Sequence, residues 1–223
     1  MKAIGRALLA AAAAFLCVGA APNWTSVVAK TEAGYRLGNP EAKVKLIAFE
    51  SYTCSHCAHF EKDAGPVLKL AYVRTGNVSY EVRSFVRDPV DLTAAMLTRC
   101  VAPAKFFDAH RAFFLSYDDW FPLAASASKA QRDRWFAADR AAARRSIASD
   151  FGFYEIIERQ GVSRVQADKC LANDALARKL ADQTKAAAET YHVSGTPSFA
   201  VDGALLIGTH NWELLRPQIE ARL

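Results

Sequence analysis

The sequence predicts one α/β fold that is interrupted by a block of helices. Three observations lead to this prediction. The apolar run Val44 to Phe49 leads into Cys54-Ser55-His56-Cys57, which opens a helical pattern. From Asp88 to Tyr191 only helical periodicity follows, and a strand and hairpin pattern returns after Ser194. Neither flanking part could close a sheet alone, so both belong to one sheet and the helices form an insertion.

Residues 1–21 have the features of a secretory signal peptide. Lys2 and Arg6 supply a positive start, Ala7 to Val18 are apolar, and the small residues up to Ala21 fit a cleavage site. The apolar segment is short for a membrane span. We expect cleavage and a periplasmic or secreted mature protein; an uncleaved anchor is the alternative.

The composition is that of a globular domain. The chain has 223 residues, of which 52% are hydrophobic, and a formal net charge of +5. Such a length can bury one sizeable core or two modest ones. Basic residues are scattered over helical stretches, and no aromatic residues interleave with a basic run. We therefore expect no nucleic-acid partner, and we expect no cofactor.

The first part of the fold contains strands and one kinked helix. Val44–Phe49 is nearly continuous in apolar residues, which suits a strand buried on both faces, and Val78–Phe85 alternates as a strand does. The helix from Cys57 to about Tyr72 has a kink at Gly65-Pro66, because proline removes a helical hydrogen bond. Two shorter strands are expected at Trp24–Lys30 and Tyr35–Leu37.

The insertion is expected to be entirely helical. Ser128 and Asn173 are suitable N-caps, and Ser163 with Gln166 forms a capping box. The expected helices are Asp91–Val101, a stretch from Pro103, Lys129–Ile147, Asp150–Gln160, Arg164–Leu171 and Asp174–Tyr191.

The last part returns to the sheet. Ser198–Val201 reads as a strand, Asp202-Gly203 as a two-residue hairpin turn, and Ala204–Ile207 as the return strand. Asn211 caps a final helix that runs to Leu223. The expected units are residues 1–21 for the signal peptide, 22–86 with 185–223 for the sheet domain, and 87–184 for the helical insertion.

The motif at Cys54 and Cys57 predicts reversible dithiol chemistry. A thiol at a helix N-terminus lies over free N–H groups, so its pKa falls and the thiolate that attacks disulfides forms. The second thiol, one turn further in, can close a ring and expel a bound partner. Half of a zinc site has the same spacing.

The cysteine count weighs against a metal site. Of five cysteines, Cys17 leaves with the signal peptide, and an even number remains in an exported chain, as paired thiols require. A four-thiolate zinc site would need Cys100 and Cys170 to form a close pair, but they lie far apart in the sequence. We expect no metal.

The chain resembles the DsbA-like branch of the thioredoxin superfamily. The resemblance depends on the strand before Thr53-Cys54-Ser55-His56-Cys57, the Gly65-Pro66 kink, the helical insertion and Gly195-Thr196-Pro197 before the hairpin strand. It covers nearly all of the mature chain. It implies a thioredoxin fold with an inserted all-helical domain.

The resemblance also implies roles for single residues. Cys54 would be the exposed nucleophile and Cys57 the resolving thiol. Pro197 would be the family's cis-proline, whose loop, with Thr196, pairs with a bound substrate. In the dipeptide, Ser55 and especially His56 would tune the redox potential, because a cationic or donating side chain stabilises the thiolate.

Two further assignments come from the resemblance. Many relatives carry a buried acid six residues before the first cysteine; here that position is Ala48, and Glu50 on the same strand face could substitute for it. Cys100 and Cys170 would form a structural disulfide, which stabilises by ~4 kcal/mol in the chain-entropy model. The alternative is two free buried thiols.

The remaining candidates receive ordinary structural interpretations. The Phe-rich helix face is expected to be core rather than a client groove, and four histidines are expected at surface or core positions. The face consists of Phe106, Phe107, Phe113 and Phe114, and the histidines are His59, His110, His192 and His210.

The expected function is the introduction of disulfides into exported proteins. The partners would be unfolded or reduced exported proteins and a membrane redox partner. Isomerase-type relatives dimerise through a long N-terminal extension, and none precedes the fold here, so we expect a monomer. A disulfide isomerase or a reductant of specific clients is the alternative within this chemistry. A copper-binding or chaperone role is the alternative outside it, and the variant Cys54→Ser would distinguish the two classes.

Overall fold

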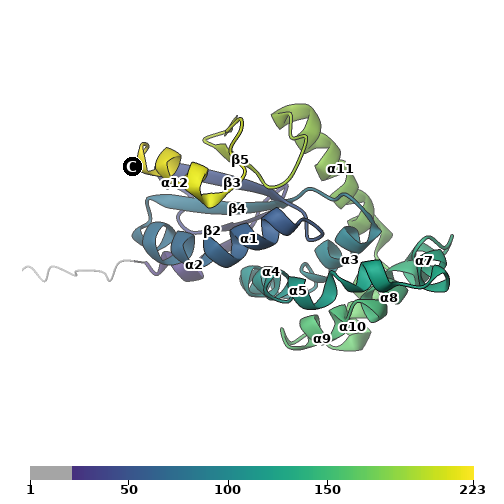
Figure 1. Ribbon diagram of the computed structural model, residues 1–223. Coiled ribbons are helices and arrows are strands. Elements are labelled where there is room, and N and C mark those ends of the chain that lie inside the picture. The colour runs from purple at the N-terminus through teal and green to yellow at the C-terminus, as the bar shows by residue number, and fades with distance from the viewer. Residues whose placement is uncertain (1–21) are drawn as a thin grey trace, which may run out of the picture.

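The protein is described by a computed structural model over residues 22–223, so the expected signal peptide lies outside the described residues. A six-stranded mixed sheet, in the order β1-β2-β4-β3-β5-β6, forms its centre (Figure 1). The strands are β1 Val28–Lys30, β2 Tyr35–Leu37, β3 Val44–Glu50, β4 Val78–Ser84, β5 Ser198–Val201 and β6 Ala204–Leu205.

The sheet joins the two parts of the sequence that the helices separate. Strand β3 pairs in parallel with β4, where Ala48 lies opposite Val82. On its other side β3 pairs antiparallel with β5, where Ala48 lies opposite Phe199. The prediction of one α/β sheet with an inserted helical block is therefore confirmed.

Helices cover both faces of the sheet. On one face, α1 (Ser55–Asp63) and the C-terminal α12 (Trp212–Glu220) pack over a core that includes Phe60, Phe199 and Leu215. Past α1 the helix is interrupted at Ala64, and the chain continues with helical backbone angles as the short α2 (Gly65–Val67) and a π-helical turn. The interruption lies beside the predicted Gly65-Pro66. On the opposite face, α11 (Asp174–Tyr191) contributes Ala187 to a smaller core with Phe49.

The insertion packs against the end of the sheet where β3 leads into α1 (Figure 1). Its apolar core is continuous with the side chains of Tyr52, Cys54, Cys57 and Ala58, so the Cys-X-X-Cys motif lies where the two parts meet. The helices are α3 Pro89–Leu97, α4 Phe106–Leu115, α5 Tyr117–Trp120, α6 Leu123–Ser126, α7 Lys129–Trp135, α8 Arg140–Asp150, α9 Phe153–Glu158 and α10 Arg164–Leu171.

Most helix boundaries follow the predicted caps, but one predicted helix was wrong. Ser163 and Gln166 form the expected capping box of α10, and Asn173 caps α11. The expected helix Lys129–Ile147 is instead two helices, because the Asp139 side chain accepts the Ala142 N–H and starts α8 anew. The helix α8 then runs on through Asp150, so the expected helix Asp150–Gln160 is reduced to α9.

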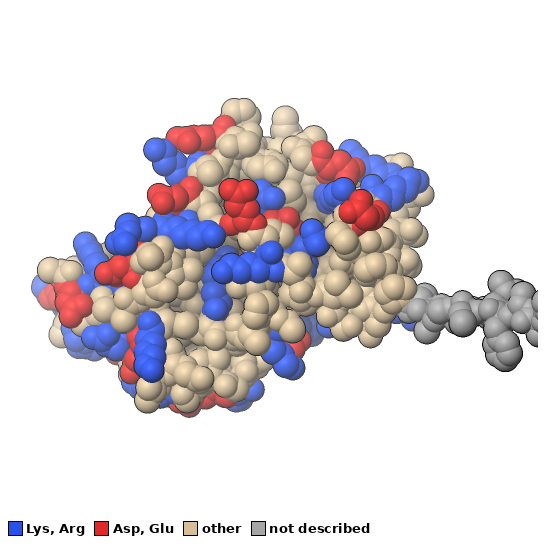
Figure 2. Space-filling view, turned by 180° about the vertical axis from the view of Figure 1, so that it is seen from behind, with Lys and Arg blue, Asp and Glu red and all other residues tan. Residues whose placement is uncertain are grey.

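Smaller differences occur at strand ends. The expected strand Trp24–Lys30 begins with a 3-10 turn and is extended only from Val28, and the return strand ends at Leu205 instead of Ile207. In the Phe-rich face, Phe106, Phe113 and Phe114 are buried and Phe107 is half-buried, as the core interpretation predicted; these three buried rings are part of the apolar cores. On the molecular face seen in Figure 2, basic and acidic side chains are interspersed.

Candidate dithiol site

Cys54 and Cys57 lie at the first turn of α1. Cys54 is the N-cap residue with extended backbone angles, and its carbonyl accepts the first helical hydrogen bond, from Ala58. Cys57 lies one turn in and is completely buried. Both are free thiols. The sequence β3-loop-α1 thus places one thiol at the helix end and the other beneath it.

The loop before Cys54 is held by the start of α3. Asp91 accepts hydrogen bonds from the Ser51 hydroxyl at 2.6 Å and from the Tyr52 N–H at 2.7 Å. Asp88 accepts a third from the Thr53 hydroxyl at 2.6 Å. Burial raises the pKa of Asp91 to about 7. The insertion therefore fixes the backbone that presents Cys54.

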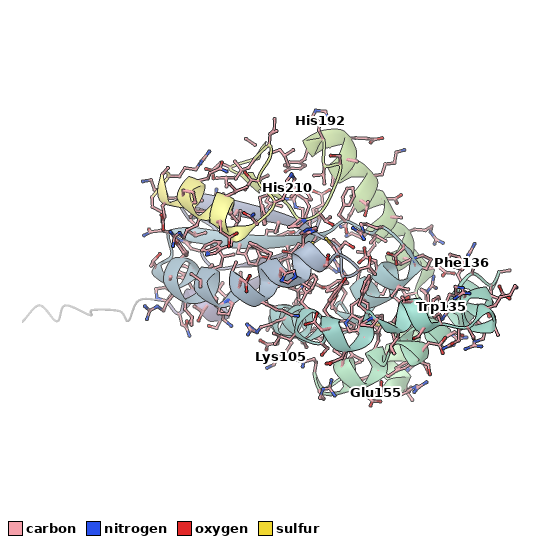
Figure 3. The ribbon with its side chains drawn as sticks, in the orientation of Figure 1. Lys105, Trp135, Phe136, Glu155, His192 and His210 are labelled. Carbon is pink, nitrogen blue, oxygen red and sulfur yellow. A yellow bond between two sulfur atoms is a disulfide. The ribbon has the colours of Figure 1, made fainter. Side chains whose placement is uncertain are left out.

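The loop before β5 lies directly against Cys54. The Cys54 thiol donates to the Thr196 carbonyl oxygen at 3.2 Å, and the Thr196–Pro197 peptide bond is cis. His210, for which no role was predicted, places its Nδ1 at 2.8 Å from the Pro197 carbonyl, while His192 lies at the far end of α11 (Figure 3). The structure thus brings Thr196 and Pro197 to the nucleophile.

The two thiols have opposite electrostatic environments. A hydrogen bond from the Cys57 thiol is the largest cause that lowers the pKa of Cys54 to about 4; Thr196, the Cys57 N–H and the charge of Arg87 lower it further, and burial opposes them. Burial is the largest cause that raises the pKa of Cys57 well above its usual value, and Cys54 and Glu50 contribute to the rise. Such asymmetry is what a nucleophile and a resolving thiol require. The expectation that Cys54 is exposed was wrong, because the residue is only 4% exposed where the insertion packs against the start of α1.

The dipeptide between the cysteines faces outward. Ser55 and His56 are exposed, and the His56 side chain makes no hydrogen bond within residues 22–223. The positive charge near Cys54 comes from Arg87, which the sequence analysis did not select. The tuning role of His56 stays a prediction.

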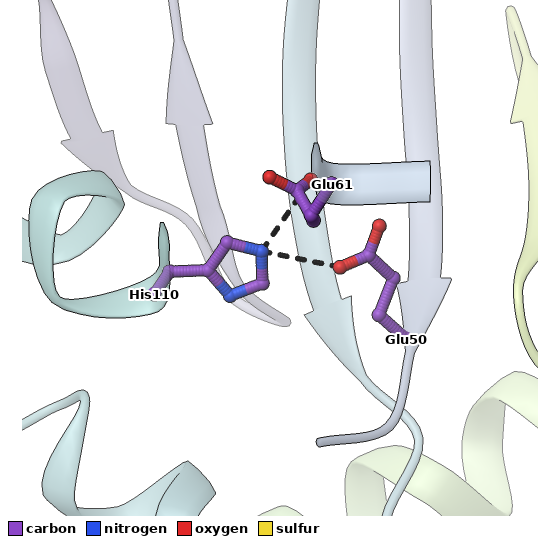
Figure 4. Close-up of side chains that lie close together, drawn as sticks. All are labelled: Glu50, Glu61 and His110. Atoms are coloured by element: carbon purple, nitrogen blue, oxygen red, sulfur yellow. Dashed lines mark ion pairs between the residues drawn. The ribbon is translucent and has the colours of Figure 1, made fainter. Parts of the chain in front are cut away.

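Glu50 is buried beneath the dithiol together with two groups that were not predicted. Its Oε2 lies 3.1 Å from Nε2 of His110, and Oε1 of Glu61 lies 3.6 Å from the same nitrogen (Figure 4). Glu61 follows Cys57 by one helical turn, a spacing that could have revealed a buried acid on the same face. His110 lies on the Phe-rich face of α4, so its burial fits the core interpretation, but its contact with two acids was missed.

The three side chains are close enough to be considered as metal ligands. Among residues 22–223, they are the group of three potential ligands whose ligand atoms all lie within 4.8 Å of one another. The Tyr80 hydroxyl donates to Oε1 of Glu61 at 2.6 Å, and Nδ1 of His110 lies 2.8 Å from the Tyr52 hydroxyl. Nε2 of His110 and Oε2 of Glu50 face each other at 3.1 Å as an ion pair. We assign no metal to this cluster.

A disulfide joins Cys100, just after α3, to Cys170 in α10. Their Cα atoms are 6.0 Å apart, and 70 positions separate them in the sequence. The bond lies entirely within the insertion. It links the segment after α3 to α10 and is not part of the site formed by Cys54 and Cys57.

Comparison with known proteins shows where similar sequences and folds occur. The family model described as Thioredoxin matches residues 30–221. The crystal structure of a protein-disulfide isomerase from Novosphingobium aromaticivorans is similar, with 51% sequence identity and a TM-score of 0.81, and the match covers 84% of this chain and 95% of that one. Wolbachia pipientis alpha-DsbA1 has a similar fold at 21% identity and a TM-score of 0.66, over 83% and 88% of the two chains.

A curated relative points in the same direction. A Rickettsia typhi protein whose name contains the words protein-disulfide oxidoreductase is 29% identical over 178 residues, which are 80% of this chain and 57% of that protein. The chain spans little more than half the length of the curated relatives it matches. Among the described residues, no helix has the length and apolarity needed to cross a membrane.

Proposed function

The chain belongs to the thioredoxin family and has a DsbA-like fold, and on that premise we propose that it is an exported thiol–disulfide oxidoreductase that introduces disulfides into secreted or periplasmic proteins. Cys54 is the nucleophile and Cys57 the resolving thiol. Thr196 and Pro197 bind the substrate backbone beside them.

The observation that carries this proposal is the contrast between the two thiols. Cys54 has its pKa lowered to about 4, so it is a thiolate at neutral pH, whereas burial keeps Cys57 protonated. A stabilised thiolate favours the reduced state, and a dithiol whose reduced state is favoured is an oxidant of other proteins.

The catalytic cycle starts from the Cys54–Cys57 disulfide. A client thiolate attacks Cys54; the Cys54–Cys57 bond breaks, a bond between Cys54 and the client forms, and the electron pair stays on Cys57. A second client thiolate then attacks the client sulfur, forms the client disulfide and releases Cys54 as a thiolate. The carbonyl of Thr196, 3.2 Å from the Cys54 sulfur, marks where the client backbone lies in the mixed disulfide.

Glu50 supplies the proton that Cys57 takes up. Burial, and next the charge of Glu61, raise the pKa of Glu50 to about 7, so it can carry a proton at neutral pH. The charge of Glu50 also acts on Cys57. A buried acid in this state can protonate the departing Cys57 thiolate. Ser55 and His56, exposed beside the nucleophile, tune the potential, because a cationic or donating side chain at His56 stabilises the Cys54 thiolate.

The partners follow from this chemistry. Clients are unfolded or reduced exported proteins, and a membrane redox partner reoxidises the dithiol. The protein acts as a monomer after residues 1–21 are removed.

An isomerase is the second candidate. The observation that favours it is the name of the Novosphingobium aromaticivorans structure, a protein-disulfide isomerase with 51% identity. An isomerase works with Cys54 as a free thiolate, and it rearranges disulfides in scrambled clients instead of oxidising reduced ones.

The test is the reduction potential of Cys54–Cys57, measured by equilibrating the mature protein with glutathione. We expect a value of about −120 to −180 mV, in the range of oxidising dithiols. A value near about −270 mV would identify an exported reductant instead. Two refolding assays then separate oxidase from isomerase. An oxidase accelerates the refolding of a reduced client, whereas an isomerase accelerates the refolding of a client with scrambled disulfides.

A matched variant tests the class of function. Cys54→Ser should abolish oxidation and isomerisation while the fold and any binding of unfolded proteins persist, since the side chain changes by one atom. If the variant retains oxidation, Cys54 is not the nucleophile.

A further inference from the structure

The cluster beneath the dithiol is assembled from four elements. Glu50 comes from the end of β3, Glu61 from α1, Tyr80 from β4, and His110 from α4 of the insertion (Figure 4). Glu50 is 2% exposed, Glu61 5% and His110 1%. Two carboxylates this close and this deep cannot both ionise unless a cation accompanies them.

The hydrogen-bond directions identify His110 as that cation. The Tyr52 hydroxyl donates its hydrogen to Thr98 at 3.1 Å, and the Thr98 hydroxyl donates its own to the Ala95 carbonyl. With that hydrogen on Thr98, the Tyr52 oxygen can accept from Nδ1 of His110, 2.8 Å away, as a doubly protonated imidazole requires. Nε2 faces the oxygens of Glu50 and Glu61 and must carry a hydrogen too.

The same reasoning separates the two acids. Tyr80 has one hydroxyl hydrogen, and its oxygen lies 2.6 Å from Oε1 of Glu61 but 3.3 Å from Oε1 of Glu50. Glu61 therefore receives this hydrogen and is the better stabilised carboxylate. Oε2 of Glu50 has no aligned hydrogen-bond partner among the described side chains. Glu50 is left as the acid that holds or releases a proton.

We propose that His110, carried by the helical insertion, is a positioning residue that keeps Glu61 ionised and thereby sets the pH at which Glu50 exchanges the Cys57 proton. This inference rests on the proposed function and deepens it, because it makes the insertion part of the redox centre.

The proton balance is as follows. When a client thiolate attacks Cys54, the electron pair of the broken bond stays on Cys57, and the proton of neutral Glu50 passes to that sulfur. The cluster then holds two carboxylates and one imidazolium, and solvent returns the proton to Glu50 before the next cycle. His110 and Glu61 keep their charges throughout.

The electrostatics agree with this geometry. Burial would lower the pKa of His110, but Tyr52, Glu61 and Glu50 raise it well above its usual value. Burial would raise the pKa of Glu61, but the charge and hydrogen bond of His110, with smaller contributions from Tyr80 and Arg111, outweigh burial. The pKa of Glu61 is therefore lower than its usual value. The other groups that face the cluster are Tyr52 from the loop before α1, Tyr80 from β4, Cys57 from α1 and Arg111 from α4.

The experiment measures the glutathione equilibrium of the mature protein from pH 5.5 to pH 8.5, in the presence of a chelator so that no metal holds the cluster. In the dithiol form the Cys54 thiolate adds a negative charge near Glu50, so Glu50 holds its proton to a higher pH than in the disulfide form. In the parent, the number of protons taken up per disulfide reduced should therefore rise above one in the pH interval between these two titrations, around pH 7. Glu50→Gln should remove this extra uptake.

Two variants should move the interval in opposite directions, each by about one pH unit or more. His110→Gln removes the cation, so Glu50 holds its proton more tightly and the interval moves up. Glu61→Gln removes the competing negative charge, so Glu50 faces His110 alone and the interval moves down. His59→Gln, an exposed histidine on α1, is the matched control and should leave the interval in place.

A merely structural role would not produce opposite shifts. The inference is overturned if neither variant moves the pH interval or if both move it the same way. If His110→Gln does not fold, the test is made with Glu61→Gln, which should move the interval down, and Glu50→Gln, which should remove it. The potential of the parent at pH 7 tests the proposed function separately, so either can fail alone.

Discussion

At the scale of single residues, Cys54 has a nucleophile's environment because several groups act on its sulfur together. The thiol of Cys57, the residue Thr196, a backbone N–H and the charge of Arg87 all favour its ionised form. The thiol and the N–H both belong to Cys57 in α1, whereas Thr196 and Arg87 come from the loops before β5 and α3, distant in sequence. The chemistry of one sulfur therefore depends on the whole junction between sheet and insertion.

The titration of Cys54 can be measured directly. We expect the thiolate absorbance of the reduced protein to show a midpoint at about pH 4. Cys57→Ala should move the midpoint upward, because it removes the largest stabilising hydrogen bond, whereas Cys57→Ser keeps a donor and should move it less. Equal midpoints in the two variants would mean that the Cys57 side chain does not stabilise the thiolate.

At the scale of elements, α3 has two separate tasks. Its N-terminal Asp88 and Asp91 hold the loop that presents Cys54, and Cys100 just past its end is bonded to α10. The disulfide thus anchors the helix from which the site is supported, although it makes no contact with the dithiol itself.

Removal of this disulfide should affect stability and leave the redox chemistry unchanged. We expect Cys100→Ala with Cys170→Ala to lower the free energy of unfolding by ~4 kcal/mol, because the open loop regains chain entropy in the unfolded state. Urea denaturation measures the loss. The reduction potential of Cys54–Cys57 in the same variant is the control, and a large change in it would show that the insertion needs the bond to hold the site.

At the scale of the whole molecule, the predicted thioredoxin fold with a helical insertion is confirmed. The support comes from the family match, from the strand order of the sheet and from the similarity of the fold to that of Wolbachia pipientis alpha-DsbA1. The helix α11 runs without interruption from the insertion to the sheet, past the expected boundary at residues 184 and 185. The two parts therefore share one long helix as well as the core around Cys54 and Cys57.

The redox state should couple to global stability in a pH-dependent way. In the folded dithiol form the pKa of Cys54 is about 4, against about 8.5 for an unfolded cysteine. The thiolate therefore stabilises the folded reduced protein fully above about pH 8.5, and this contribution is lost as pH falls through about 4. The disulfide form has no such group.

We expect the free energy of unfolding of the reduced form, minus that of the oxidised form, to increase from pH 4 to pH 8. Denaturation of both forms across this pH range measures the difference. The reduced form is prepared with glutathione under conditions that reduce only the Cys54–Cys57 bond. The variant Cys54→Ser cannot form the disulfide, so it is measured as a single form, and its free energy of unfolding should follow the pH dependence of the oxidised parent. A flat difference in the parent would contradict the low pKa.

The sequence by itself determined the fold class, the strand-to-helix position of Cys54 and Cys57 and the caps of α10 and α11. These features are local: a buried strand, a capping box or a Cys-X-X-Cys spacing expresses physical preferences of neighbouring residues. The break between α7 and α8 was missed because two local preferences competed there, and the cap at Asp139 prevailed over helical periodicity.

Only the tertiary structure decided the surroundings of the dithiol. Arg87, Asp91, Glu61 and His110 were not selected from the sequence, although each places an ionisable group at or beneath the site. The protonation of a buried acid depends on charges within a few ångströms in space, whatever their distance along the chain. Periodicity places a residue on a face, but packing decides which charge it meets there.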